Sequence, residues 1–212
     1  MTGELWTTGQ GGTEKAAVAL ACGGVVGFPT DTVYGLACSP ASEAAIARVC
    51  EIKGRSASQP LILLAATRAD LDEFVSWPEA AVELIDRFWP GPLTLIVEAR
   101  PPARFLGGQG TVGVRIPAHS VALLLLRQAG PLATTSANRH GEEPAADAIS
   151  ALRLLPGLQG ALADPQSRPV PGAPSSILDL TREKPVLIRE GRLSARELGV
   201  SAPVQGPGIR RD

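Results

Sequence analysis

The chain has 212 residues and a mass of 22.0 kDa, enough for one domain with a substantial hydrophobic core. Its net charge of -1 gives no overall attraction to nucleic acid, although a local group of arginines could hold a small anion. The three cysteines lack the spacing of a zinc site or a disulfide framework, and no window approaches the roughly 20 apolar residues of a membrane span. We therefore expect a cytoplasmic protein that is not bound to a membrane.

The first third of the chain alternates helix and strand patterns. Thr13 is a candidate N-cap for a helix that stops at the glycines opening GGVVGFP, residues 23–29, and this stretch is typical of a short buried strand. Ser42 opens a second predicted helix, because apolar residues recur behind it at helical spacing. LILL, residues 61–64, predicts another buried strand.

The middle of the chain repeats this alternation. A helical stripe over residues 82–89 precedes two strand patterns, PLTLIVEA at 92–99 and VGVRIP at 112–117. SVALLLLRQAG, residues 120–130, predicts a capped helix, and PLATTSAN, residues 131–138, follows it.

The last third of the chain has the sequence pattern of a β-hairpin. Residues 176–180 and 186–189 are strand candidates separated by the polar turn TREK, so antiparallel pairing joins the sheet. The pattern as a whole predicts an α/β fold, with a twisted, open sheet of mixed parallel and antiparallel strands flanked by helices. No composition shift marks a domain boundary, and we expect residues 203–212 to be a frayed tail.

Familiar nucleotide, metal and hydrolase signatures are absent from the sequence. There is no GxxxxGK[ST], and GQGG at residues 9–12 lacks a preceding strand and a third glycine, so we interpret it as a flexible lead-in. His119 and His140 have no partners at ligand spacing, which predicts surface loop residues. Ser136 lies in TTSAN without a nearby base, so covalent hydrolase chemistry has no support.

Polar and cationic side chains remain at the ends of the predicted strands, where open α/β sheets bind ligands. Guanidinium groups grip phosphate or carboxylate with two bonds, so the set suits a polyanion together with a small zwitterion. Two plainer interpretations stay open: KGR at 53–55 as a solvated helix end, and TTSAN as a turn. The set comprises Thr30, Asp31, Thr32, Tyr34, Lys53, Arg55, Thr111, Arg115, Thr134, Ser136, Asn138, Ser175, Ser176 and Arg189.

Six blocks occur in a fixed order: GGVVGFPTDTVYGLA, KGRSASQPLILL, WPGPLTLIV, GTVGVRIPAH, ATTSAN and PSSILDLT with VLIREG. In this order and at these separations, they resemble the single-domain form of the YrdC-like threonylcarbamoyl-AMP synthases. The resemblance covers residues 14–193 and includes the paired KxR and SxN motifs of that family, at 53–55 and 136–138. Residues 1–13 would then be a lead-in and residues 194–212 a tail.

The resemblance implies a sheet folded around a concave, positively charged cavity, and a nucleotidyltransferase activity. L-threonine, bicarbonate and ATP, with Mg²⁺, would give L-threonylcarbamoyl-AMP and pyrophosphate. This product serves the formation of threonylcarbamoyladenosine in tRNA, through downstream proteins that transfer the threonylcarbamoyl group. Whether this chain contacts tRNA directly stays open.

The resemblance also assigns site residues by motif position. Arg115 would be the partner of the threonine carboxylate. The threonine-binding residues would be Thr32, Arg115, Thr134 and Ser175. The ATP-binding residues would be Arg55, Gln59, Thr111, Ser136 and Arg189, and the catalytic set would be Lys53, Arg55, Ser136 and Asn138.

Departures from the family pattern limit this transfer of roles: RHGEEP, residues 139–144, varies in length across the family, so whether Ala145 approaches ATP stays open. Gln59 stands where an asparagine or histidine is frequent, and Leu64 stands where some members have a histidine that touches threonine. Asp31 is the nearest acid to the threonine residues, but a cap or turn role is as well founded, so no general base is assigned.

Two other functions compete with this one. Related domains occur in carbamoyltransferases of hydrogenase maturation, but the acylphosphatase and zinc-finger modules fused to those domains are not found in this sequence. A non-catalytic RNA-binding or regulatory module is disfavoured by the net charge of -1 and the 4% content of aromatic residues.

Overall fold

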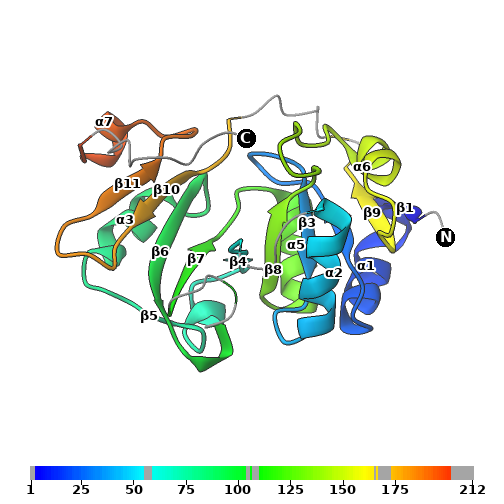
Figure 1. Ribbon diagram of the computed structural model, residues 1–212, viewed down its shortest axis with the longest axis horizontal. Coiled ribbons are helices and arrows are strands. Elements are labelled where there is room, and N and C mark those ends of the chain that lie inside the picture. Colours follow the sequence, from blue (N-terminus) through cyan, green and yellow to red (C-terminus); the bar gives the residue numbers. More distant parts are fainter. Residues whose placement is uncertain are drawn as a thin grey trace.

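One open, mixed sheet organises the chain, and helices lie on both of its faces (Figure 1). The order of strands along this 11-stranded sheet is β1-β9-β2-β3-β8-β4-β7-β6-β10-β11, and β5 pairs with β6 outside that path. The strands are β1 Glu4–Thr7, β2 Val26–Phe28, β3 Gly35–Cys38, β4 Ile62–Leu64, β5 Val75–Ser76, β6 Leu93–Ala99, β7 Thr111–Arg115, β8 Leu132–Ser136, β9 Gly160–Ala163, β10 Ser176–Asp179 and β11 Val186–Arg189. The computed structural model describes residues 3–54, 59–103, 106, 110–164, 166 and 173–201.

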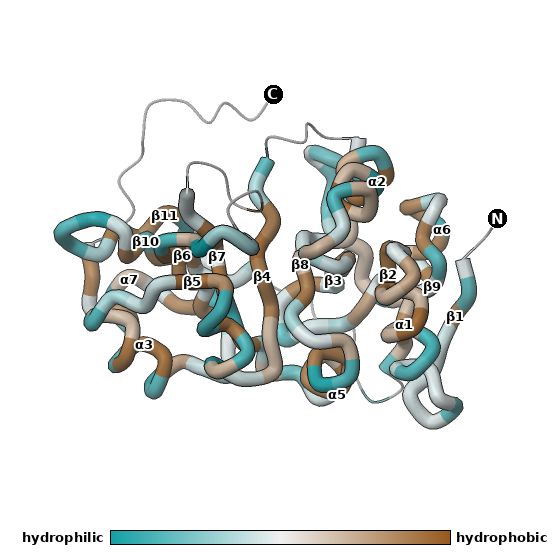
Figure 2. The backbone as a smooth tube through the Cα atoms, turned by 90° about the horizontal axis from the view of Figure 1, so that it is seen from below, coloured by the Kyte–Doolittle hydropathy of each residue, from teal (hydrophilic) through white to brown (hydrophobic). Residues whose placement is uncertain are grey.

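The sheet is covered differently on its two faces. One hydrophobic cluster includes residues of α1 and α5, whereas the other includes residues of α2, α3, α6 and α7. Leu63 belongs to the second cluster and Leu64 to the first, as the two-residue period of a strand requires. Figure 2 shows β4 as hydrophobic along most of its length. The α-helices are α1 Gly12–Ala21, α2 Glu43–Lys53, α3 Ala81–Phe88, α5 Ser120–Ala129, α6 Ala148–Leu154 and α7 Ala195–Leu198.

The mixed sheet confirms the predicted fold class. Parallel pairs such as β4 with β7 occur together with antiparallel pairs such as β6 with β7, and β10 and β11 form the predicted hairpin. The helix predicted after Ser42 is confirmed, and the Ser42 hydroxyl accepts a hydrogen bond from the backbone N–H of Ala45 at 3.2 Å. Within the described residues, no helix is both long and apolar enough to span a bilayer.

The structure corrects the expectation for the N-terminal residues. Strand β1 lies inside the predicted lead-in and pairs in parallel with β9, and GQGG runs directly into α1. Helix α1 begins one residue before Thr13 and has Gly11 as its N-cap, in the left-handed conformation at φ 68°. The predicted cap is therefore wrong. Thr13 is instead a buried helical residue.

Several elements were not predicted from the sequence: β3, β9, α6 and α7. Helix α7 is short, and its N-cap Ser194 forms a capping box with Glu197 inside the segment expected to be a tail. The tail prediction for residues 203–212 lies outside the described residues.

Replacing Gly160 with alanine tests the pairing of β1 with β9. A Cβ atom at Gly160 would lie 2.5 Å from the ring of Trp6 and 2.7 Å from the Glu4 carbonyl oxygen. We expect Gly160→Ala to lower the free energy of unfolding by about 1–3 kcal/mol, because β1 must shift to admit the methyl group. Urea unfolding measures this change.

Gly9→Ala is the matched control, because a Cβ atom there has no neighbour within 4 Å. It should leave the free energy of unfolding nearly unchanged. Equal stability of the two variants would show that β1 does not pack against β9 in solution.

Candidate active site

A cavity of about 530 Å³ collects most of the candidate residues. It lies on the same face of the sheet as α1 and α5, because Leu64 and Phe28 belong both to its lining and to the cluster beneath those helices. In β4, alternate residues face it, namely Ile62 and Leu64, whereas Leu63 between them does not. The expectation of a crevice beyond the strand ends is thus corrected: the cavity spreads across the face of the sheet.

Arg115, at the end of β7, is the most buried cation of the cavity, at 2% exposure. Its Nε donates to the Gly91 carbonyl at 2.8 Å and its Nη1 to the Thr32 hydroxyl at 2.9 Å, while its Nη2 pairs with the Asp31 carboxylate. Burial lowers the pKa of Arg115, and the neighbouring Asp31 charge opposes that shift. Further N–H groups of this guanidinium remain for a ligand.

Ser175 joins the terminal hairpin to the cavity. Its hydroxyl is 2.8 Å from the Thr94 hydroxyl, and its carbonyl accepts hydrogen bonds from Arg189 Nε and Nη2 at 3.1 and 2.9 Å. Arg189 is exposed as a residue, but its guanidinium bends onto Ser175, and burial of that group lowers its pKa. Thr94 was missed from the sequence because it lies within an otherwise apolar strand pattern.

Lys53 of the KxR motif meets the SxN motif at the end of β8. Lys53 Nζ donates to the Ser136 carbonyl at 2.5 Å and to the carbonyl and side-chain oxygens of Asn138 at 2.8 and 3.0 Å. The Ser136 hydroxyl also donates to Asn138 Oδ1, at 2.5 Å. The buried ammonium of Lys53 therefore holds the turn after β8, and Ser136 faces the cavity from that turn.

The predicted site residues fall into three groups. Six of them line the cavity: Thr32, Arg115, Thr134, Ser136, Ser175 and Arg189. Four are described but do not line it: Lys53, Gln59, Thr111 and Asn138. Arg55 lies outside the described residues. Their roles toward substrates stay predictions.

Two acids in the lining were not found from the sequence. Glu142 and Glu143 follow β8 in the segment RHGEEP and face the cavity together with Pro144. They offset the charge of Arg115 and Arg189, so the positive charge of the cavity stays a prediction.

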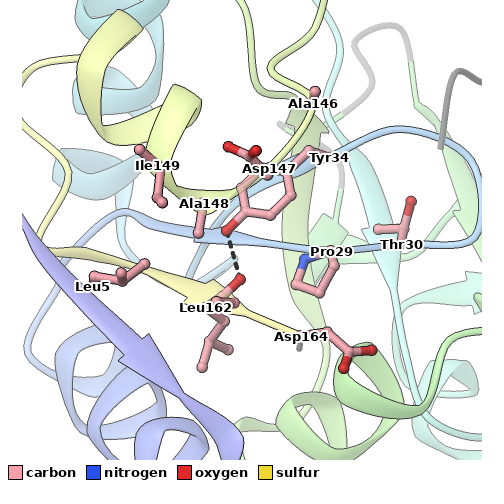
Figure 3. A pocket seen from close by; sticks show the side chains of 11 residues that line it. Leu5, Pro29, Thr30, Tyr34, Ala146, Asp147, Ala148, Ile149, Leu162 and Asp164 are labelled. Atoms are coloured by element: carbon pink, nitrogen blue, oxygen red, sulfur yellow. Dashed lines mark hydrogen bonds between the residues drawn. The ribbon is translucent and has the colours of Figure 1, made fainter. Parts of the chain in front are cut away.

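The hydroxyl-rich loop between β2 and β3 also borders a second, smaller cavity of about 140 Å³, whose lining is shown in Figure 3. Thr30 lines both cavities, and its hydroxyl donates to the Val33 carbonyl at 2.6 Å. On the far side of the loop, the Tyr34 hydroxyl donates to the Leu162 carbonyl at 2.8 Å. The loop is thereby fixed by its own hydroxyls.

The two histidines differ in their surroundings. His140 is exposed, as predicted. His119 is not a surface residue: its side chain is 10% exposed, and its Nε2 lies 3.7 Å from Asp164 Oδ2. Burial lowers the pKa of His119, and the charges of Asp164 and Asp31 oppose that shift. The sequence does not signal this environment, because Asp164 is brought to His119 by the pairing of distant strands.

Two arginines and several hydroxyls gathered in one cavity of an open α/β sheet fit the pattern of a small-molecule site. The model of the Sua5/YciO/YrdC family, described as "Telomere recombination", matches residues 18–191. The chain belongs to this family.

Named relatives agree with that assignment. A putative threonylcarbamoyl-AMP synthase of Mycobacterium leprae is 38% identical over 192 residues, covering 88% of this chain and 86% of the relative. The threonylcarbamoyl-AMP synthase of Pyrococcus abyssi is 39% identical over 83% of this chain, which spans only 53% of that protein. A crystal structure of P. abyssi Sua5 with L-threonine superposes with a TM-score of 0.84 at 36% identity, covering 92% of this chain and 59% of the other.

The environment of Tyr34 is directly testable, because it is the single tyrosine of the chain. Burial, reinforced by the Asp147 charge, raises its pKa well above the usual value. We expect no phenolate absorbance in the folded protein at about pH 10, where a free tyrosine is half ionised. Ultraviolet titration of folded and urea-unfolded protein measures this difference.

The raised pKa also has a consequence for stability. An acid whose pKa is higher in the folded state stabilises the fold below its unfolded pKa, and this contribution is lost as the pH rises through the folded value. Ionisation of the folded protein at the usual tyrosine pKa would contradict the buried hydrogen bond to Leu162.

Proposed function

We propose that this chain is an L-threonylcarbamoyl-AMP synthase, which converts L-threonine, bicarbonate and ATP to L-threonylcarbamoyl-AMP and pyrophosphate. The observation that carries the proposal is the convergence of Arg115, Thr32, Thr134 and Ser175 in one cavity with Arg189 and Ser136. The names of relatives 38–39% identical, and the threonine complex of P. abyssi Sua5, support it.

Threonine would occupy the part of the cavity around Arg115. Its carboxylate would accept hydrogen bonds from the guanidinium, and the hydroxyls of Thr32 and Thr134 would meet its polar groups, because each polar group needs a partner once it is desolvated. Phe28 and Leu64 line the same cavity and offer an apolar wall to the threonine methyl group. Leu64 therefore contributes apolar area where some members of the family have a histidine.

ATP would lie toward Arg189 and Ser136. The threonine amine would attack bicarbonate to give a carbamate with loss of water, and a carbamate oxygen would then attack the α-phosphorus and displace pyrophosphate. The protein acts mainly by positioning both reactants and stabilising charge on the leaving group. No side chain becomes covalently attached, and Lys53 would act by fixing the turn that carries Ser136 and Asn138.

Mg²⁺ would accompany ATP. Magnesium is usually held by substrate phosphates, water and one or two carboxylates, and Glu142 and Glu143 are carboxylates of the cavity lining. These two residues fit such a role. The ion would neutralise phosphate charge.

The other predicted functions have less support. The relatives that are 38–39% identical carry the synthase name, which favours the synthase over a carbamoyltransferase and over a non-catalytic RNA-binding role. The cytoplasmic location, the contribution to tRNA threonylcarbamoyladenosine and the downstream transfer proteins follow from the proposed activity and stay predictions.

Product analysis tests the proposed activity. Purified protein with ATP, Mg²⁺, L-threonine and bicarbonate should form threonylcarbamoyl-AMP, detected by mass spectrometry, together with pyrophosphate. Omission of either threonine or bicarbonate should abolish both products. Pyrophosphate release that is independent of these two substrates would refute the proposal.

A pair of arginine variants tests how the substrates are distributed. Arg115→Ala should weaken threonine binding by about 2–5 kcal/mol, because a buried carboxylate loses its cation, and should spare ATP binding. Arg189→Ala should weaken ATP binding by about 1.5–3 kcal/mol and spare threonine. Calorimetric titration of both ligands into each folded variant measures the two effects. Normal threonine affinity in Arg115→Ala would mean that the carboxylate is held elsewhere.

A further inference from the structure

Two arginines that line the cavity differ in how their charge is compensated. Arg115 is buried and ion-paired with the Asp31 carboxylate. Arg189 is an exposed residue whose guanidinium bonds the neutral carbonyl of Ser175, and within the described residues no carboxylate forms an ion pair with it. Arg115 therefore has a carboxylate in direct contact, whereas Arg189 bonds only neutral oxygens of Ser175. Glu142 and Glu143 lie in the same lining, but neither forms an ion pair with Arg189 in the described part of the chain.

Asp31 is held firmly enough to keep that countercharge in place. Its side chain is 14% exposed, and its backbone carbonyl accepts a hydrogen bond from Arg192 Nη1 at 2.8 Å. The next residue, Thr32, accepts from Arg115 Nη1 at 2.9 Å, so the loop is bound to the arginine at two successive residues. Arg192 adds a positive charge near Arg115, but it is exposed and more strongly screened than the buried pair.

We propose that Asp31 is a specificity-determining residue that acts through Arg115: by neutralising this guanidinium, it reserves the Arg115 end of the cavity for a zwitterion and directs phosphate groups to Arg189. The inference rests on the proposed function, in which threonine is the zwitterion and ATP the polyanion. Asp31 does not line the cavity. It is thus a positioning residue rather than a catalytic one.

The physical reason is that the two proposed substrates compete for the same guanidinium. Both substrates carry negative groups, and an unpaired guanidinium would attract the more highly charged phosphates at least as well as a carboxylate. The Asp31 charge repels any lone anion that approaches Arg115, whereas an amino acid brings an ammonium group that offsets this repulsion. Asp31 would thus make Arg115 selective by lowering its affinity for phosphate groups and other anions that lack an ammonium group.

Four probes separate this role from a purely structural one. They are L-threonine, 3-hydroxybutanoate, which lacks the ammonium group of threonine, 1-amino-2-propanol, which lacks its carboxylate, and inorganic phosphate. Each is titrated calorimetrically into wild-type protein and into Asp31→Asn, which keeps the side-chain size but removes the charge. Asp31→Glu keeps the charge. Asp86→Asn makes the same chemical change on the exposed side of α3 and serves as the matched control.

In wild-type protein, phosphate should leave threonine affinity unchanged. In Asp31→Asn, the affinity of 3-hydroxybutanoate relative to threonine should rise about tenfold, and phosphate should begin to compete with threonine. The affinity of 1-amino-2-propanol should fall. Asp31→Glu and Asp86→Asn should retain the wild-type ranking of the four probes.

Two results would overturn the inference. One is a parallel loss of threonine and 3-hydroxybutanoate affinity in Asp31→Asn, which would leave Asp31 a structural role alone. The other is competition between phosphate and threonine in wild-type protein, which would show that the Arg115 end is not reserved for a zwitterion. This second test needs no folded variant. Failure of the proposed function gives a different result, because wild-type protein would then bind no threonine. The phosphate titration would still test the role of Asp31: a higher phosphate affinity in Asp31→Asn than in wild type would support it.

Discussion

A buried guanidinium ties the two halves of the sheet together. Arg115 belongs to the half that contains β4, β7, β6, β10 and β11, and it binds Asp31 and Thr32 of the loop between β2 and β3, in the other half. Removing one partner from such a buried charged group costs about 3–5 kcal/mol, although the complete set adds little net stability. The arginine therefore fixes where the loop lies, and the shape of the cavity follows from that position.

The two-residue period of a strand then divides β4 and β6 between the two faces of the sheet. In β6, Leu93 and Leu95 belong to the hydrophobic cluster, whereas Thr94 between them points to the opposite face and bonds Ser175. The same division places Leu63 in that cluster and Leu64 against the cavity. A shift of one residue in either strand would exchange its core and cavity residues, so packing of the core also positions the site.

The sequence predicts those elements whose own residues include a cap and a regular apolar spacing. Helix α2 is an example, because Ser42 and the apolar spacing behind it suffice to place its start. Strands β3 and β9 have the sequences GLAC and GALA, which carry no clear strand pattern, and their pairing depends on neighbours far along the chain. Long-range contacts of the site share this property. The bond from Arg192 to Asp31 joins residues 161 positions apart, and no spacing rule reveals it.

The hydroxyl-rich loop after β2 illustrates why a binding site needs more polar groups than its ligand touches. The Thr30 hydroxyl bonds the Val33 carbonyl and Tyr34 bonds Leu162, so both stabilise the loop itself. Thr32 faces the cavity and is already held by Arg115. Because these side chains are ordered before any ligand arrives, binding does not have to supply the entropy cost of arranging them. The loop can therefore offer a small ligand fixed partners, which is what the proposed reaction requires, because it depends on positioning.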